Sequence, residues 1–436
     1  MIDLERYAAL ARASRGPTPQ GRVHDVVGLL VEVVGVNAAT GDRLEVLTPK
    51  GGLVVEVLGF RQGRLLCAPL GSTLGVEPGA TVRNLGIGSK IPVGDALLGR
   101  VIDAFGAPLD GKPAPLCNER AALTREPPPS FGRKPIQDPF ETGVRAIDAL
   151  LPLGRGQRVG LFAGTGVGKS TLLGMLCKRA QADVVVVGLV GERGREVGDF
   201  VAHALGEGLK RSVVVAATSD AAPLVRVQGA LAATAIAEHF RDRGKNVLLV
   251  MDSVTRFAMA LREASLAAGE PPVTKGYTPS VFAALPTLLE RAGTTTGSGS
   301  ITAIYTVLVE GDDLNDPIAD AVRGILDGHI VLSRALAERG VYPAIDVLKS
   351  VSRVFDVVTT PDHKKAAIEA RNMMGIYREA SDLIKIGAYV AGTDARIDAS
   401  CRVEPRLEAI VRQGTGELVS RVDALRVLQA ALKINA

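Results

Sequence analysis

Aromatic residues and cysteine are scarce in this chain of 436 residues, which has no tryptophan, ten phenylalanines, six tyrosines and four cysteines. So few aromatic side chains offer few stacking platforms for single-stranded nucleic acid, and we expect no nucleic-acid partner. The cysteines lie far apart and form no CxxC pair, which argues against a disulfide framework and a zinc site. We expect all four to be buried thiols. They are Cys67, Cys117, Cys177 and Cys401.

Long apolar runs are also absent. No segment approaches the roughly 18 consecutive apolar residues that a membrane-spanning helix requires. The first residues, MIDLERYAALARAS, contain acidic side chains and lack the apolar centre of a secretory signal peptide, so a cytoplasmic location is predicted. The 51 basic and 47 acidic residues are mixed along the chain, and the net charge of +4 is only weak evidence for a polyanionic partner.

The length and the hydrophobic pattern predict several folded domains. A chain of 436 residues is too long for one hydrophobic core. From Gly21 to Gly94, short β-branched or alternating runs separated by glycine turns predict a small β-barrel or sandwich. Between Val93 and Pro139, loops rich in proline and glycine predict a connector that packs on the next domain.

The texture changes twice more along the chain. After Leu150, apolar strand candidates alternate with helical segments, which is typical of a mostly parallel sheet covered by helices. Beyond Pro361 no strand is evident, and the amphipathic pattern predicts a helical terminal domain.

The strongest local signal is the segment AGTGVGKST, from Ala163 to Thr171, between a predicted strand and a predicted helix. A phosphate-binding loop needs this context, because its glycines let backbone N–H groups approach phosphate oxygens and the helix directs its positive end at them. Lys169 would contact the β- and γ-phosphates of ATP, and Ser170 would ligate Mg²⁺. The predicted nucleotide-binding residues here are Gly164, Thr165, Gly166, Val167, Gly168, Lys169, Ser170 and Thr171.

One position departs from the usual phosphate-loop pattern. Ala163 stands where that pattern begins with glycine, although the glycines that allow close approach of the phosphates are all present. A glycine-rich turn that binds no nucleotide is the alternative interpretation.

Two further strand ends carry carboxylates. Asp252 ends the apolar run VLLVMD, as a Walker-B carboxylate of the Mg²⁺ shell does, although a strand-end aspartate is also commonly a cap. Glu192 and Arg193 follow the predicted strand VVVVGLV, where side chains reach the ligand-binding edge of such a sheet. Glu192 can polarise the attacking water, with Glu196 as the competing base and an ordinary solvated loop charge as the third possibility.

Together with the phosphate loop, several longer segments resemble the ring ATPases related to the catalytic subunit of F- and V-type ATP synthases. They are most similar to the type III protein-export ATPases. The segments are GERGREVGDF, MDSVTRFAMALRE, GEPPVTKGYTPSVFAALPTLLERAG, GSITAIYTVLVEGDDLNDPIADAVRGILDGHIVLSR and YPAIDVLKSVSRV. This resemblance implies an α/β P-loop (RecA-like) core, an N-terminal small β-barrel and a C-terminal helical domain. The implied boundaries are 1–94, 95–360 and 361–436.

The resemblance also implies roles for single residues. It supports Lys169 and Ser170 as ligands of phosphate and Mg²⁺, Asp252 as the Walker-B carboxylate and Glu192 as the carboxylate that activates water. Arg193 matches the site arginine of the family's GER motif.

Two residues near the end of the predicted core match family positions outside the phosphate loop. Tyr342 matches the aromatic residue that packs against adenine, with a plain core or interface aromatic as the alternative. Arg353 matches the arginine finger that enters the neighbouring protomer's site, with a surface salt bridge as the alternative. The acidic loop that contains Asp312, Asp313 and Asp316 matches the loop facing the central channel of the ring, where a basic stalk protein would bind, with solvated loop charges as the alternative.

The implied function is a homohexameric ATPase that energises flagellar or virulence type III export by releasing and unfolding chaperone-bound substrates. Its implied partners are a central stalk protein, a peripheral stator-like regulator, substrates and chaperones, and the export gate at the inner membrane. The protein would then be peripheral to the cytoplasmic face of that membrane. The main alternative is a catalytic subunit of an ion-translocating F/V-type ATP synthase, and a helicase or a non-catalytic ring subunit fits the sequence less well.

The phosphate-loop assignment predicts that Lys169→Ala abolishes ATP binding, because the only side-chain cation of the loop is removed from the phosphates. Equilibrium titration with a fluorescent ATP analogue measures this. Tight binding retained by the variant would contradict the assignment.

Overall fold

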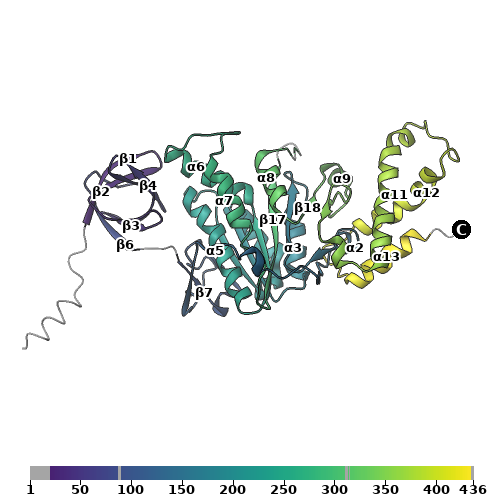
Figure 1. Ribbon diagram of the computed structural model, residues 1–436, viewed down its shortest axis with the longest axis horizontal. Helices are drawn as coiled ribbons and strands as arrows, with labels where there is room; N and C mark the ends of the chain where they lie inside the picture. The colour runs from purple at the N-terminus through teal and green to yellow at the C-terminus, as the bar shows by residue number, and fades with distance from the viewer. Residues whose placement is uncertain (1–19, 87–89, 310–312, 314, 434–436) are drawn as a thin grey trace, which may run out of the picture.

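The computed structural model describes residues 20–86, 90–309, 313 and 315–433. Figure 1 shows an elongated molecule with a barrel at one end, a sheet flanked by helices in the middle and a group of helices at the other end. This order confirms the fold class expected from the sequence. The predicted domain boundaries stay predictions.

The N-terminal barrel is a closed, six-stranded antiparallel sheet with the strand order β1-β2-β5-β4-β3-β6. Alternate side chains of its strands point inward and form a core of valine and leucine, as the period-two pattern of the sequence requires. Closure leaves the barrel without a free sheet edge. The strands are β1 (Gln20–Val27), β2 (Leu30–Val34), β3 (Arg43–Thr48), β4 (Gly51–Arg61), β5 (Arg64–Pro69) and β6 (Thr81–Gly86).

The central part is built on a nine-stranded sheet with the order β19-β18-β12-β17-β15-β13-β14-β8, and β16 pairs with β17 beside this path. Strands β18, β12, β17, β15, β13, β14 and β8 are parallel to one another. The strands are β8 (Arg100–Ile102), β12 (Arg158–Ala163), β13 (Val184–Val190), β14 (Ser212–Ala217), β15 (Asn246–Asp252), β16 (Gly293–Thr294), β17 (Ser300–Leu308), β18 (Gly328–Val331) and β19 (Val351–Ser352).

Helices cover both faces of this sheet, which explains why its strands read as continuous apolar runs. All seven residues of β13, for example, are buried. One core layer lies between the sheet and helices α5 to α8, and the other lies between the sheet and α3. The helices are α2 (Arg145–Leu150), α3 (Lys169–Arg179), α4 (Gly194–Asp199), α5 (Pro223–Asp242), α6 (Val254–Ala267), α7 (Pro279–Leu289), α8 (Pro317–Ile325), α9 (Arg334–Glu338) and α10 (Phe355–Val358).

The connector between the barrel and the central sheet contains more regular structure than its composition predicts. Strands β7 (Lys90–Val93) and β9 (Glu119–Ala122) pair with each other, and β8 becomes the edge strand of the central sheet beside β14. Short strands in a segment rich in proline and glycine give almost no periodic signal, because pairing with an existing sheet decides their conformation. The sequence therefore predicted the packing of this segment and missed its strands.

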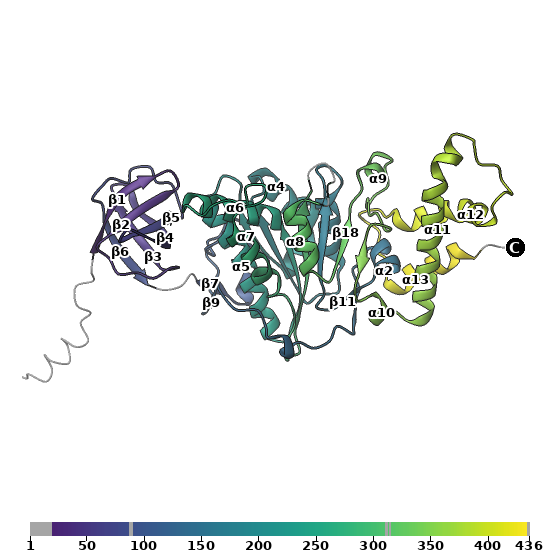
Figure 2. The same cartoon turned by 45° about the horizontal axis from the view of Figure 1, so that its top comes forward.

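The C-terminal part consists of α11 (Pro361–Lys385), α12 (Ala395–Val411) and α13 (Arg421–Leu432), as the sequence predicts. Their buried faces join the core layer that α3 shares with the sheet, through residues such as Ala367, Leu407 and Leu428. Figure 2 shows α2 lying between the central sheet and these helices. Among the described residues, no helix is both long and apolar enough to cross a membrane.

Candidate functional site

The phosphate-loop segment joins the end of β12 to the start of α3. Gly166 and Gly168 have φ angles of 78° and 89°, so the loop uses the left-handed region that glycine adopts without strain. Val167 is buried and anchors the loop in the core, whereas Ser170 is exposed at the first turn of the helix. The loop therefore presents its backbone and its hydroxyl group outward while its middle is held by packing.

Lys169 meets both predicted carboxylates. Its ammonium group forms an ion pair with Oδ1 of Asp252 and lies 3.6 Å from Oε1 of Glu192. Lys169 and Glu192 follow β12 and β13, and Asp252 is the last residue of β15; these strands lie close together in the sheet and end at the same edge. Asp252 and Glu192 are 3% and 8% exposed, so two carboxylates share one poorly solvated place with one lysine.

Glu192 is held in its protonated form more readily than an ordinary glutamate. Burial and a hydrogen bond with Glu196 raise its pKa from 4.5 to about 7, against the opposing influence of Lys169. The same hydrogen bond lowers the pKa of Glu196. The two candidate bases are therefore neighbours: Glu192 is buried, and Glu196 is exposed at the entrance to the cluster.

Two side chains of this cluster were not predicted from the sequence. Arg256, on α6, donates a hydrogen bond of 2.6 Å to the Gly191 carbonyl and lies 3.4 Å from Oε1 of Glu192. Thr306, on β17, donates a hydrogen bond of 2.7 Å to Oδ1 of Asp252. Arg256 lies in the first turn of α6, four residues after Asp252 in the segment MDSVTRF, and this short distance along the chain from a strand-end carboxylate is a signal that could have found it. Thr306 had no such signal, because strand pairing alone brings it to the aspartate.

The donor set is suited to a divalent cation. Oxygen atoms of carboxylates and hydroxyls are the ligands that Mg²⁺ prefers, and Asp252 and Ser170 supply one of each. Oε1 of Glu192 is buried and accepts no hydrogen bond from the described residues, although Lys169 and Arg256 lie 3.6 Å and 3.4 Å from it. The residues present therefore fit a magnesium ion beside bound phosphates, with Asp252 and Ser170 as the residues that would hold it.

Tyr342 lies beside the phosphate loop of its own chain. A Cβ atom on Gly168 would be 3.2 Å from the Tyr342 ring, so the ring and the loop are in close contact. The backbone N–H of Gln413 donates to the Tyr342 carbonyl over 2.9 Å, which connects this tyrosine to the loop after α12. Tyr342 remains 44% exposed, leaving much of its ring free for a flat ligand.

A cavity of about 680 Å³ opens beside the first turn of α3. It is large enough for a nucleotide-sized ligand. Its lining combines α3, the segment around α4 and the loop after α12, and it includes Ser170, Thr171, Glu196, His203, Thr415 and Gly416.

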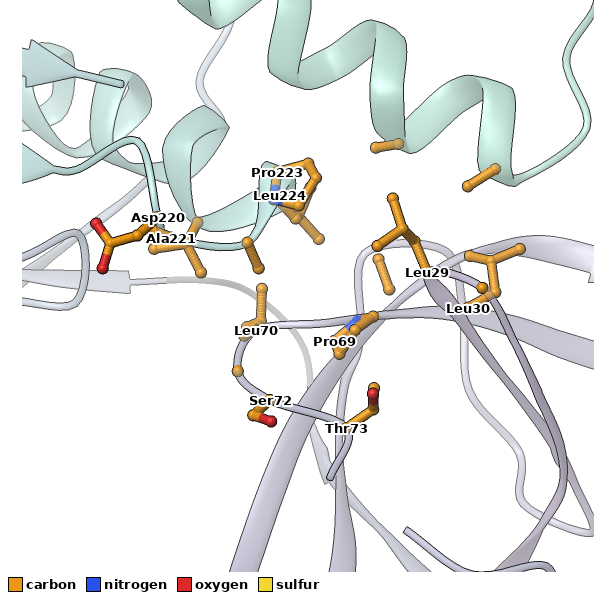
Figure 3. Close-up of a pocket in the computed structure, with 17 residues that line it drawn as sticks. Leu29, Leu30, Pro69, Leu70, Ser72, Thr73, Asp220, Ala221, Pro223 and Leu224 are labelled. Carbon is orange, nitrogen blue, oxygen red and sulfur yellow. The ribbon is translucent and has the colours of Figure 1, made fainter. Parts of the chain in front are cut away.

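A second hollow, of about 460 Å³, lies between the barrel and helices α5 and α6 (Figure 3). Figure 3 shows Leu29, Leu30 and Pro69 of the barrel facing Pro223 and Leu224 of the central part. Among the described residues that line it, Asp220 is the only charged one. The described lining of this hollow therefore offers no cation for a phosphate, and it includes none of Lys169, Glu192 and Asp252.

Arg193 and Arg353 lie outside the cluster. The Arg193 side chain is 80% exposed and pairs with Glu196 over 3.3 Å. Arg353 is exposed, and its backbone N–H donates to the Asp327 carbonyl at the amino end of β18. Since the phosphate loop follows the carboxyl end of β12, a neighbouring six-residue strand, the two sites are separated by roughly 20 Å of sheet. Arg353 therefore lies far from the phosphate loop of its own chain.

The acidic loop is only partly described. Asp312 lies outside the described residues. Asp316 caps α8 by accepting hydrogen bonds from Ile318 and Ala319, and it lies 3.3 Å from the Lys275 ammonium. Asp313 accepts a hydrogen bond of 2.9 Å from the Asn315 N–H, so two of the three predicted stalk-contacting aspartates already have local partners.

The cysteines are free thiols among the described residues. Cys67 and Cys177 are buried, as expected, whereas Cys117 and Cys401 are half-buried.

A glycine-bearing loop between a parallel strand and a helix, with its lysine against a strand-end carboxylate, defines the P-loop nucleoside triphosphatases. The nucleotide-binding domain model of the ATP synthase alpha/beta family matches residues 143–352, and the model of the C-terminal domain of the EscN ATPase of type III secretion matches residues 359–430. The chain belongs to the ATP synthase alpha/beta family, within the type III protein-export ATPases, and is an ATP-hydrolysing enzyme.

Relatives match along almost the whole chain. The flagellum-specific ATP synthase of Bacillus subtilis is 52% identical over 91% of both chains. The type 3 secretion system ATPase of Xanthomonas euvesicatoria is 48% identical over 98% of this chain and 96% of its own. Among solved structures, the assembled ATPase EscN of enteropathogenic E. coli superposes with a TM-score of 0.90, 45% identity and coverage of 95% of this chain and 100% of that chain.

The raised pKa of Glu192 predicts a pH-dependent difference between the parent protein and Glu192→Gln. The folded state holds the Glu192 proton more tightly than the unfolded state, so this contribution to stability is complete below pH 4.5 and is lost as the pH rises through about 7. Glutamine does not titrate. Without nucleotide, the melting temperature of Glu192→Gln should therefore rise relative to that of the parent as the pH increases from 5 to 8.

Differential scanning fluorimetry across that pH range measures the effect. Glu207→Gln is the matched control, because Glu207 pairs with Lys210 on the fully exposed surface. A difference between Glu192→Gln and the parent that stays constant with pH would contradict the prediction.

Proposed function

We propose that this protein hydrolyses ATP in a homohexameric ring that energises type III protein export, flagellar or virulence-related, by releasing and unfolding chaperone-bound substrates. The observation that carries the proposal is the convergence of Lys169, Asp252 and Glu192 at one sheet edge in a chain that matches export ATPases along its length. The division into residues 1–94, 95–360 and 361–436 belongs to the same proposal.

Each residue of the cluster has a proposed role. Lys169 binds the β- and γ-phosphates with the backbone of residues 164–168, and Ser170 and Asp252 hold Mg²⁺, which supplies positive charge to the phosphates when bound. Glu192 orients and polarises the attacking water. Its buried position next to Lys169 supports this choice over Glu196, whose place at the entrance suits a partner that shares a proton with Glu192.

Two further roles are proposed for residues around the cluster. Tyr342 stacks on adenine with the exposed part of its ring, a type of contact worth about 1–3 kcal/mol in nucleic-acid complexes. Arg193, exposed beside Glu196, supplies a second cation near the phosphates.

Arg353 is proposed as an arginine finger that acts on the neighbouring protomer. Its exposure and its place at the opposite end of the sheet from its own phosphate loop support action in trans. Fingers supplied in trans raise hydrolysis rates by about 10³–10⁵. A site that needs a neighbour's arginine makes the isolated chain a weak ATPase.

The proposed partners follow from the relatives. EscN has been solved as an assembly and in complex with its central stalk EscO, and the latter structure is 44% identical to this chain with a TM-score of 0.88. We propose that a central stalk binds here too, near Asp312, Asp313 and Asp316. A peripheral stator-like regulator, substrates, chaperones and the export gate complete the proposed set, with the ring at the cytoplasmic face of the inner membrane and no nucleic-acid partner.

An F/V-type ATP synthase subunit is the less favoured alternative. The nucleotide-binding domain model alone would accommodate it, but the C-terminal model that matches residues 359–430 is that of a type III secretion ATPase. The named relatives are export ATPases as well.

Mixing two inactive variants tests both the catalytic site and the ring. Arg353→Ala lacks the finger and Glu192→Gln lacks the base, so each variant alone should hydrolyse ATP very slowly. In randomly mixed 1:1 rings, about a quarter of the sites combine an intact Glu192 with an intact neighbouring Arg353, and activity should recover to that extent. Steady-state phosphate release measures it, with mass photometry to verify mixed rings.

The controls separate the parts of the proposal. Mixing Arg353→Ala with Lys169→Ala and Glu192→Gln double-variant protein should recover the same fraction, because that partner contributes only its finger. No recovery in verified mixed rings would refute the finger in trans. A parent protein without ATPase activity as a ring would refute the catalytic proposal itself.

A further inference from the structure

Asp252, the proposed Walker-B carboxylate, has a second partner besides Lys169. This partner is Thr306, which has no proposed part in binding the nucleotide. The hydroxyl of Thr306 lies 2.7 Å from Oδ1 of Asp252 and 3.2 Å from the Met251 carbonyl oxygen. A hydroxyl has one proton to donate, and a carboxylate is the stronger acceptor. The shorter distance agrees, so the proton of Thr306 goes to Asp252.

The surroundings of Thr306 require a hydrogen-bond partner for its hydroxyl. Thr306 is 0% exposed and lies in β17 among apolar residues such as Ile304 and Val307. A buried hydroxyl without a partner costs about 1–3 kcal/mol, whereas valine has nearly the same shape and no such cost. Thr306 meets this requirement through Oδ1 of Asp252 and the Met251 carbonyl, of which the carboxylate is the nearer acceptor.

Strand β17 is well placed to control Asp252. It lies between β12, which leads into the phosphate loop, and β15, which ends in Asp252. Thr306 is the register partner of Leu161 on β12, and Tyr305 is the partner of Met251 on β15. The hydroxyl thus belongs to the strand that fixes the spacing between the loop and the aspartate.

The two oxygen atoms of Asp252 are used differently as a result. Oδ1 accepts from both Lys169 and Thr306, while no donor among the described residues contacts Oδ2. Two bonds to one oxygen fix the rotation of the carboxylate about its Cβ–Cγ bond. When phosphates draw the ammonium of Lys169 away, the bond from Thr306 is the one that remains.

We propose that Thr306 is a positioning residue for magnesium: its hydroxyl holds Oδ1 of Asp252 so that Oδ2 keeps the orientation needed to bind the Mg²⁺ shell. The inference rests on the proposed ATPase function and adds a residue to it. Outer-sphere partners of this kind change metal affinity or activity by about 10–100-fold when they are removed.

The test compares Thr306→Val, which removes the hydroxyl at constant shape, with Thr306→Ser, which keeps it. We expect Thr306→Val to raise the free Mg²⁺ concentration for half-maximal ATPase activity about 10-fold or more and Thr306→Ser to stay near the parent value. A binding measurement complements the kinetics. The rise in melting temperature caused by ATP in EDTA should be equal in all proteins, and the additional rise caused by Mg²⁺ should shrink in Thr306→Val.

Thr302→Val is the matched control. Thr302 lies four residues earlier on the same face of β17, is 1% exposed, and its hydroxyl oxygen accepts a hydrogen bond from Gly156 away from the nucleotide site. This variant should lower the melting temperature and leave the Mg²⁺ dependence unchanged.

Three results would overturn the inference: parental Mg²⁺ dependence in Thr306→Val, an equal Mg²⁺ defect in Thr306→Ser, or the same defect in Thr302→Val. If Thr306→Val does not fold, Thr306→Ala replaces it as the variant without the hydroxyl. Its Mg²⁺ dependence is then compared with that of Thr306→Ser in the same way. A parent chain with no Mg²⁺-dependent hydrolysis would refute the proposed function itself. An active parent together with an unaltered Thr306→Val protein would refute only the role of Thr306.

Discussion

The ion pair between Lys169 and the strand-end carboxylates Asp252 and Glu192 is the interaction on which the rest of the site depends. Two negative groups with little exposure to water are costly unless a cation lies between them, and Lys169 is that cation. Lys169 belongs to the phosphate-loop segment, so its ion pairs hold this segment against the ends of β13 and β15. A bound nucleotide would bring phosphates to Lys169 and Mg²⁺ to the carboxylates, and these contacts would replace the ion pairs within the protein.

The architecture follows from bringing these charges to one edge. Parallel strands with short connections deliver side chains from separate parts of the sequence to the same end of the sheet. Helices on both faces bury the strands of the sheet, and the C-terminal helices extend one of the two core layers up to the loop that contacts Tyr342. The loop after α12 therefore links the C-terminal helices to Tyr342.

The sequence predicted those parts whose signal is local. The phosphate loop, the barrel and the helical end all follow from glycine spacing and hydrophobic period, and Asp252 and Glu192 follow from their positions after apolar runs. The strand β8 and the contacts of Thr306 were not predictable, because both depend on which strands pair in three dimensions. Arg256 lies in the segment MDSVTRFAMALRE, yet its contact with Glu192 depends on the direction that α6 takes after β15. The roles of Tyr342 and Arg353 came from family resemblance alone, and they stay predictions.

The most direct test of this account is single-turnover hydrolysis of Mg²⁺-ATP by assembled Glu192→Gln protein, with Glu196→Gln as the matched control. Glutamine keeps the size of Glu192 and its contact with Lys169 but does not accept a proton from water. The account predicts that Glu192→Gln binds ATP with near-parental affinity and leaves it unhydrolysed, while Glu196→Gln retains substantial turnover. Hydrolysis by Glu192→Gln at a rate close to that of the parent, together with an inactive Glu196→Gln protein, would contradict the assignment of Glu192 as the base.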